Sequence, residues 1–129
     1  MKYLLTLYGD ESRYADMTPE QSAESMKRWE AYTIETRDAG AFLAGEGLQP
    51  SATATTVKIE ESGDHIVSDG PFAETKEQLG GFYMLECANL DEAIGWAKKI
   101  PMQGGTIEVR PVMDYGESEV HSQSAEAVA

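Results

Sequence analysis

The chain has 129 residues, of which 41% are hydrophobic and 26% charged, and its formal net charge at pH 7 is −13. These values are typical of one soluble globular domain with a modest core. No apolar run approaches the roughly 20 residues that span a bilayer, and the strong negative charge repels nucleic acid and anionic membranes. The composition therefore predicts that neither a membrane nor a nucleic acid is a partner.

Cysteine and histidine are scarce. The one cysteine, Cys87, rules out an intramolecular disulfide, and its place in an apolar run favours a small core residue over a nucleophile. His65 and His121 lie in different regions, and no cluster of Cys and His has zinc-binding spacing. The short apolar N-terminus lacks a small-residue cleavage site, so it is interpreted as a strand. We expect a cytoplasmic protein without a metal or other cofactor.

A strand and a long helix open the chain. Residues 1–8 carry β-forming apolar residues at successive positions, which predicts a strand buried on both faces. Thr18 is a favourable helix N-cap, Pro19 suits the first helical position, and Gln21 can close a capping box. The helix is predicted to run to about residue 39, with Gly40 at its end.

The remaining elements alternate in the same way. Strands are predicted at residues 41–45, 81–87 and 106–110, and residues 53–59 and 65–68 form a hairpin. Asn89 is the predicted cap of a second helix, with Glu92 three residues later completing a capping box, and Pro101 ends the helix. The order predicts an α+β, ferredoxin-like βαββαβ fold over residues 1–113 with an inserted hairpin, followed by a loose acidic tail at 114–129. Because such a sheet has one bare face, we expect a homodimer that packs sheet to sheet.

A loop at residues 69–81 separates two apolar runs and is dense in turn formers and charge. Pro71 prevents a central strand, while Gly70 and the Gly80-Gly81 pair permit backbone shapes that other residues avoid. The loop is interpreted as holding its charged residues near one another. It is either a functional loop beside a cleft or a long solvated connection.

Three charged residues are candidates for catalysis. Asp69 is a candidate general base or orienting carboxylate, although Asp before Gly-Pro is also an ordinary turn residue. Glu46 stands between two glycines at a strand end and is a candidate second carboxylate in the same cleft. Lys76 is a candidate partner of either carboxylate or of an anionic substrate, or else a solvated surface lysine.

Aromatic residues supply the candidate ligand contacts. Trp29 and Tyr32 are large for a helix surface, which favours core packing, a dimer contact or a ligand. Tyr8, at the end of the first strand, is a candidate lining residue, although half-buried packing is the favoured interpretation. The predicted ligand-contact set is Tyr8, Trp29, Tyr32, Phe72 and Tyr83.

The run Asp-Gly-Pro-Phe-Ala-Glu-Thr-Lys-Glu-Gln-Leu-Gly-Gly-Phe-Tyr at 69–83 resembles the signature of the DGPF branch of YCII-related proteins. The opening Met-Lys-Tyr-Leu-Leu, the Gly-Glu-Gly-Leu-Gln-Pro at 45–50 and the Ile-Glu-Val-Arg-Pro-Val at 107–112 fit it as well. The resemblance covers about residues 1–113 and implies a dimeric α+β barrel of ferredoxin-like subunits.

The resemblance also implies two functions. The wider family is associated with a His–Asp pair in a cleft, and one relative is a dehydrochlorinase. Asp69 matches the Asp, but residues 19–39 contain no histidine, so Glu46, Lys76, Trp29 or Tyr32 would fill that role. The first hypothesis is therefore a metal-free acid–base enzyme for elimination or isomerisation of a small organic molecule. The alternative is a non-catalytic ligand- or protein-binding module in extracytoplasmic-function sigma-factor signalling.

Overall fold

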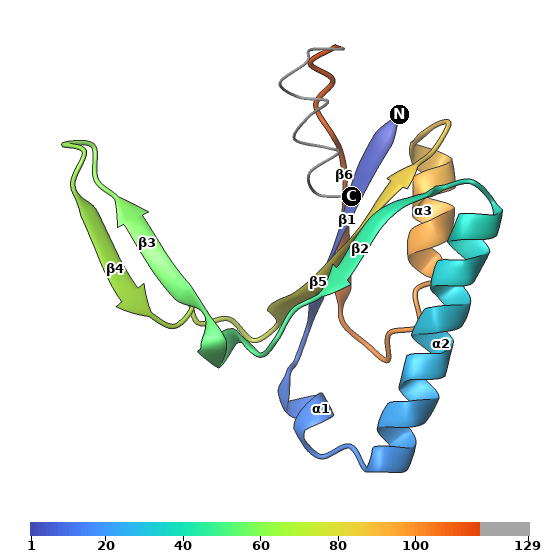
Figure 1. Ribbon diagram of the computed structural model, residues 1–129, viewed down its shortest axis with the longest axis horizontal. Coiled ribbons are helices and arrows are strands. Elements are labelled where there is room, and N and C mark those ends of the chain that lie inside the picture. The colour runs from blue at the N-terminus through green and yellow to red at the C-terminus, as the bar shows by residue number, and fades with distance from the viewer. Residues whose placement is uncertain (117–129) are drawn as a thin grey trace.

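The computed structural model describes residues 1–116, which form a sheet-and-helix body and a projecting hairpin (Figure 1). The body holds a four-stranded antiparallel sheet in the order β2-β5-β1-β6, and β3 and β4 form a separate two-stranded sheet. The elements are β1 (Lys2–Gly9), α1 (Ser12–Ala15), α2 (Pro19–Asp38), β2 (Phe42–Gly47), η1 (Ser51–Thr53), β3 (Thr55–Ile59), β4 (His65–Asp69), β5 (Gln78–Glu86), α3 (Leu90–Lys98) and β6 (Thr106–Pro111).

This sheet order and the two long helices confirm the predicted ferredoxin-like α+β fold. The short elements α1 and η1 were not predicted, because three or four residues are too few to show a helical period. Most of the predicted acidic tail, 114–129, lies outside the described residues. Within residues 1–116, every helix is too short or too polar to cross a bilayer.

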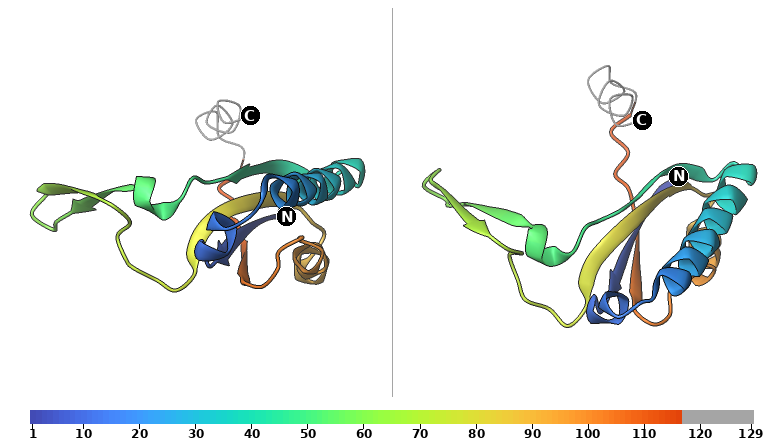
Figure 2. Two further views of the ribbon diagram at one scale, coloured as in Figure 1. Left: turned by 90° about the horizontal axis from the view of Figure 1, so that it is seen from below. Right: turned by 60° about the horizontal axis from the view of Figure 1, so that its bottom comes forward.

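The core lies between one face of the sheet and the two long helices. Alternate residues of β1, namely Tyr3, Leu5 and Leu7, are buried on this face. The intervening Leu4 and Thr6 point to the opposite face and are only half-buried. The prediction that this strand is buried on both faces is therefore wrong for the single chain, because the helices cover only one side (Figure 2).

Both helix starts follow the sequence signals. The Thr18 side chain accepts from the Gln21 amide at 3.1 Å, and the Gln21 side chain accepts from the Thr18 amide at 3.0 Å. This confirms the predicted capping box. Asn89 caps α3 by accepting from the Glu92 amide at 3.0 Å, which confirms the predicted cap. The predicted second capping box is wrong, because the Glu92 carboxylate accepts from the Ala88 amide instead of the Asn89 amide. These caps fix where each helix leaves the sheet.

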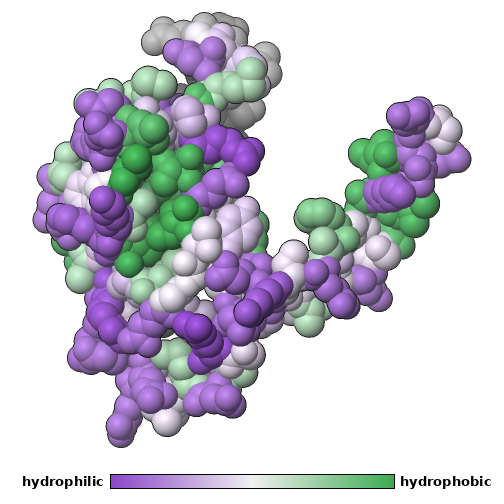
Figure 3. Space-filling model, turned by 180° about the vertical axis from the view of Figure 1, so that it is seen from behind, coloured by the Kyte–Doolittle hydropathy of each residue, from purple (hydrophilic) through white to green (hydrophobic). Residues whose placement is uncertain are grey.

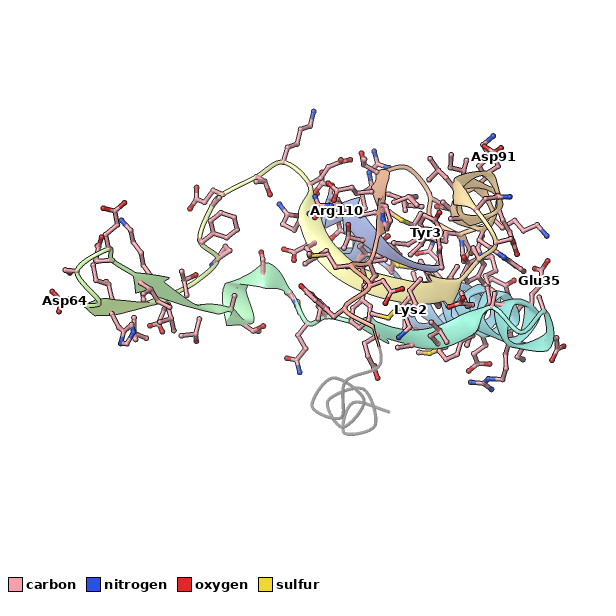
Figure 4. All side chains as sticks on the ribbon, turned by 90° about the horizontal axis from the view of Figure 1, so that it is seen from above. Lys2, Tyr3, Glu35, Asp64, Asp91 and Arg110 are labelled. Atoms are coloured by element: carbon pink, nitrogen blue, oxygen red, sulfur yellow. The ribbon has the colours of Figure 1, made fainter. Side chains whose placement is uncertain are left out.

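Residues 51–77, here called the arm, leave the body between β2 and β5. The arm contains η1, the β3–β4 hairpin and the segment that leads into β5. It extends from the side of the sheet opposite to α2 and α3 (Figures 1 and 2). Figure 4 shows Asp64 at its tip, remote from Tyr3 in the body. The predicted hairpin is thus confirmed, but it stands apart from the main sheet.

The glycines around the predicted loop serve two different purposes. Gly70 has a φ of +95°, which confirms that it adopts a backbone shape that other residues avoid. Gly80 and Gly81 instead lie within β5, and neither has a positive φ. A Cβ at Gly81 would lie 2.8 Å from the Glu46 carbonyl oxygen, so this glycine permits the close approach of β2 and β5.

Candidate functional site

A cavity of about 920 Å³ opens between the N-terminal half of α2, the short helix α1 and the adjoining ends of β1, β2 and β5. Its volume is in the range of small-molecule sites. Its wall is mostly apolar. The large apolar and aromatic side chains around it are Leu7, Tyr14, Met17, Met26, Trp29, Leu48, Tyr83 and Met102.

Two aromatic rings form one wall of the cavity. Trp29 of α2 and Tyr83 of β5 lie with ring centroids 6.3 Å apart and planes only 7° apart. The Tyr83 hydroxyl lies 3.0 Å from the Thr33 hydroxyl, and the rings of Tyr32 and Phe42 meet Tyr83 edge-on. This wall is therefore held by both a hydrogen bond and ring packing, so it is largely formed before any ligand binds.

Gly45 makes room for this wall because glycine has no side chain. A Cβ at Gly45 would lie 2.9 Å from the Tyr83 ring and 3.3 Å from the Phe42 ring. Because such distances are shorter than van der Waals contact, any larger residue would push Tyr83 from its position. The glycine before Glu46 is thus explained by the aromatic side chain that packs over it.

The only charged residues that line the cavity within residues 1–116 are Glu11 and Glu46. The Glu11 carboxylate accepts from the Ser51 amide at 2.7 Å and from the Ser51 hydroxyl at 2.8 Å. The Glu11 amide donates to the Gln78 side chain at 3.0 Å. Glu11 therefore links the end of β1 to the base of the arm, and both of its carboxylate oxygens already accept hydrogen bonds.

Glu46 differs from Glu11 because its carboxylate has no hydrogen bond or ion pair with any residue that the structure describes. It follows Gly45 in the edge strand β2, and its partner in β5 is Phe82. Gly45 faces the Tyr83 ring and Glu46 follows it in the strand, so the Glu46 side chain points, like that of Phe82, to the sheet face that lacks helices.

A turn next to the cavity carries a third carboxylate, Asp10. It accepts from the Ser12 hydroxyl at 2.6 Å and from the Ser12 amide at 3.0 Å. These two bonds lower the pKa of Asp10, and the charges of Arg13 and Lys76 act in the same direction. Asp10 thus stabilises the start of α1 as an ionised turn residue.

Comparison with known proteins places this architecture in a family. The model of the YCII-related domain matches residues 1–116. This chain belongs to the YCII-related family. An uncharacterized protein of Rhizobium meliloti (strain 1021) is 38% identical over 125 residues, which are 95% of this chain and 100% of that protein. The match includes both the cavity and the arm.

The structure brings together only part of the site predicted for this YCII-related protein. Glu46, Trp29 and Tyr83 line the cavity. Asp69 ends β4 and Lys76 follows it in the arm, and neither residue lines the cavity. Phe72, also in the arm, is 90% exposed. The expected juxtaposition of Asp69, Lys76 and Glu46 is therefore absent from the described part of a single chain.

The other two predicted aromatic residues lie elsewhere. Tyr32 is buried in the core, and its hydroxyl donates to the Trp96 carbonyl at 2.9 Å. Burial, with smaller contributions from Tyr83, Cys87 and Glu35, raises the pKa of Tyr32 above its usual range. Tyr8 alternates with the buried Leu7 along β1, so it faces the side of the sheet without helices.

Several residues of the cavity were not singled out from the sequence. Glu11 carried a signal, because it lies two residues after the end of the first strand, where clefts often form. Met26 lies on the weak apolar stripe of α2. Leu48 and Met102 come from connections whose position in space follows only from the fold. Within residues 1–116, no group of three or more His, Cys, Asp and Glu is placed to hold a metal ion.

Proposed function

We propose that this YCII-related protein binds a small, largely apolar organic molecule in the cavity. The observation that supports this most directly is the wall formed by Trp29 and Tyr83, whose rings lie nearly parallel with centroids 6.3 Å apart at the cavity. The surrounding Met, Leu and aromatic side chains favour an apolar body for the ligand.

The chemistry of the lining also defines the charge of the ligand. Within residues 1–116 both charged residues of the lining are acidic, and the lining contains no Lys, Arg or His. An anionic ligand would meet repulsion without a compensating cation. We therefore expect a neutral or cationic molecule with an aromatic or aliphatic body.

Elimination or isomerisation that begins with proton abstraction from carbon is the reaction class that we propose for this ligand. In an elimination, a base takes the proton, the C–H electrons form a double bond, and the leaving group departs with its electron pair. Neither Asp69 nor Glu46 is assigned as the base in the single chain, because Asp69 does not line the cavity and the Glu46 side chain points to the other face of the sheet. The cytoplasm remains the expected location.

A pair of fluorescent probes tests the proposal. N-phenylnaphthylamine is neutral, and anilinonaphthalene sulfonate has the same aromatic body with a negative charge. We expect the neutral probe to bind at least about tenfold more tightly than the anionic probe. Glu46→Gln should reduce this ratio of affinities several-fold, because it removes a nearby negative charge. Glu30→Gln on the exposed side of α2 removes the same charge away from the cavity and serves as the control.

A second pair of variants locates the binding site. Ser25 lines the cavity from α2, whereas Ala23 on the same helix is exposed and does not line it. We expect Ser25→Phe to fill the cavity and abolish binding of N-phenylnaphthylamine, and Ala23→Phe to leave it unchanged. Equal binding by both variants would contradict the assignment of the cavity as the ligand site.

We also propose that the protein is a homodimer that covers the sheet face lacking helices. On that face Leu4 of β1 and Phe82 and Met84 of β5 are half-buried in the single chain. Packing of two such faces would remove these side chains from water. Sedimentation equilibrium at micromolar concentration tests this assembly, and a monomer under those conditions would refute it.

A further inference from the structure

The arm has one apolar face. In an antiparallel pair, residues directly opposite each other point to the same side. Val57 pairs with Val67, and Ile59 pairs with His65, so the aliphatic side chains of these pairs share one face. Val57, Ile59 and Val67 are 56%, 68% and 66% exposed. The opposite face carries Thr56 with Ser68 and Lys58 with Ile66.

Nothing in the described part of the chain covers this face. The hairpin forms its own sheet, and Figure 3 shows hydrophobic residues gathered along it, well away from those on the body. A two-stranded hairpin is at best marginally stable alone in water. Exposed apolar patches on an ordered element commonly mark a contact with another molecule. The arm also lies inside the matched family domain, so it is part of the domain itself.

The position of the arm indicates what covers it. It extends on the same side as the sheet face that lacks helices (Figures 1 and 2). Packed sheets lie about 10 Å apart, whereas the five residues of β3 span about 17 Å. A second copy of the chain on the open sheet face would therefore lie beside the arm. The arm is long enough to extend past the sheet of that second copy.

The size of the open face favours the same occupant. Four strands about 4.8 Å apart and about 20 Å long present a footprint of roughly 400 Å². A stable interface removes about 800 Å² of surface from each partner. The sheet face alone is thus small for a lasting dimer, and an arm from each subunit enlarges the contact. Because a two-fold axis repeats every contact, both arms would be covered at once.

We infer that the apolar face of the arm packs against a second copy of this chain, so that each subunit embraces the other. The inference rests on the homodimer proposed above and does not depend on the ligand or on Glu46. It brings Phe72 and Asp69 of the arm, both outside the cavity of their own chain, to the partner subunit.

Charge-matched variants test the role of this face. V57E/V67E places two negative charges on the apolar face, and K58Q/S68E makes the same change in net charge on the opposite face of the hairpin. We expect V57E/V67E to weaken the dimer by at least about 100-fold, since two valines would no longer be buried. K58Q/S68E should change the dimer constant by less than about threefold. Equal effects of the two variants would overturn the inference.

A distance measurement separates the possible occupants. A nitroxide on Val67→Cys, in chains of natural isotope composition, is mixed with ¹⁵N-labelled wild-type chains so that mixed dimers form. Cys87 is buried, which favours labelling at the introduced cysteine. Broadened amide signals in the labelled wild-type chains would support the inference.

The remaining outcomes all count against it. A dimer without broadening would show that the arm does not contact its partner subunit. A monomer would remove the second copy altogether, whether or not N-phenylnaphthylamine binds the cavity. Loss of binding to a sigma factor in V57E/V67E, with the dimer unchanged, would assign the arm to that partner instead.

Discussion

Trp29 of α2 and Tyr83 of β5 stand nearly parallel, with ring centroids 6.3 Å apart, at the wall of the cavity. Fifty-four positions separate them in the sequence, and only the packing of helix on sheet brings them together. Tyr83 is further held by its contact with the Thr33 hydroxyl. The pair joins the core to the site, because Tyr83 packs on Tyr32 while Trp29 remains open to the cavity.

This relationship predicts the effect of changing Trp29. We expect Trp29→Ala to weaken binding of N-phenylnaphthylamine about tenfold, because an aromatic contact contributes about 0.5–1.5 kcal/mol beyond the area that it buries. Trp29→Phe should restore most of the affinity. Trp96 packs on Tyr32 without lining the cavity, so Trp96→Phe is the control. Fluorescence titration measures the affinity, and undiminished binding by Trp29→Ala would exclude Trp29 from the site.

Glu11 provides a prediction about the base of the arm. Its carboxylate accepts two bonds from Ser51, and hydrogen bonds to charged groups are each worth about 1.5–3 kcal/mol. We expect Glu11→Ala to lower the free energy of unfolding by about 3 kcal/mol, since both bonds are lost, and Ser51→Ala, which keeps the amide bond, to lower it by about half as much. Urea denaturation gives both values. Hydrogen exchange at the Ser51 amide should accelerate only in Glu11→Ala, and unchanged exchange there would contradict this role.

Local signals in the sequence were sufficient for most of the fold. The cap at Thr18, the cap at Asn89 and the alternation in β5 depend on neighbouring residues, and the structure confirms them. The hairpin was also predicted, since Val57 and Ile59 alternate with polar residues before a turn. The separation of the hairpin from the main sheet was not predicted, because alternation shows which face of a strand is apolar but not which part of the molecule covers that face.

The site was harder to predict because it depends on contacts between distant segments. Glu46 and Tyr83 were singled out and do line the cavity, whereas Glu11 was missed although it forms two of the bonds that shape it. Asp69 and Lys76 were placed near Glu46 because the first two belong to one loop and Glu46 stands at a strand end, where clefts often form. The arm carries that loop away from the body, and the direction of a hairpin is set by tertiary packing rather than by local sequence.

Cys87 should be unreactive in the folded protein. It is 3% exposed, which confirms the core position predicted for it. Burial raises the pKa of its thiol, and the negative charges of Glu92 and Glu86 act in the same direction. Because the thiolate is the nucleophile, we expect modification by a thiol reagent at pH 7.5 to be at least about 100-fold slower than in urea. Ser62→Cys in the exposed turn of the arm is the positive control, and equally fast reaction of both thiols would refute the prediction.

The burial of the Tyr32 hydroxyl predicts how the free energy of unfolding changes at high pH. Its buried hydroxyl donates to the Trp96 carbonyl, and burial raises its pKa above the usual value of 10.0. Between that value and the raised pKa, the unfolded chain releases the proton while the folded chain retains it. The contribution of Tyr32 is therefore complete below pH 10 and decreases as the pH rises above it.

Urea denaturation of wild type and Tyr32→Phe at pH 8 and pH 11 tests this linkage. At pH 8 we expect Tyr32→Phe to be less stable by about 1 kcal/mol, since the Trp96 carbonyl loses its donor. At pH 11 the difference should shrink or reverse, because phenylalanine cannot ionise in the unfolded chain. Tyr14→Phe, at an exposed position of α1, controls for the other tyrosines. If the loss of stability from pH 8 to pH 11 is the same in wild type and Tyr32→Phe, then the Tyr32 hydroxyl is not the group that burial keeps protonated.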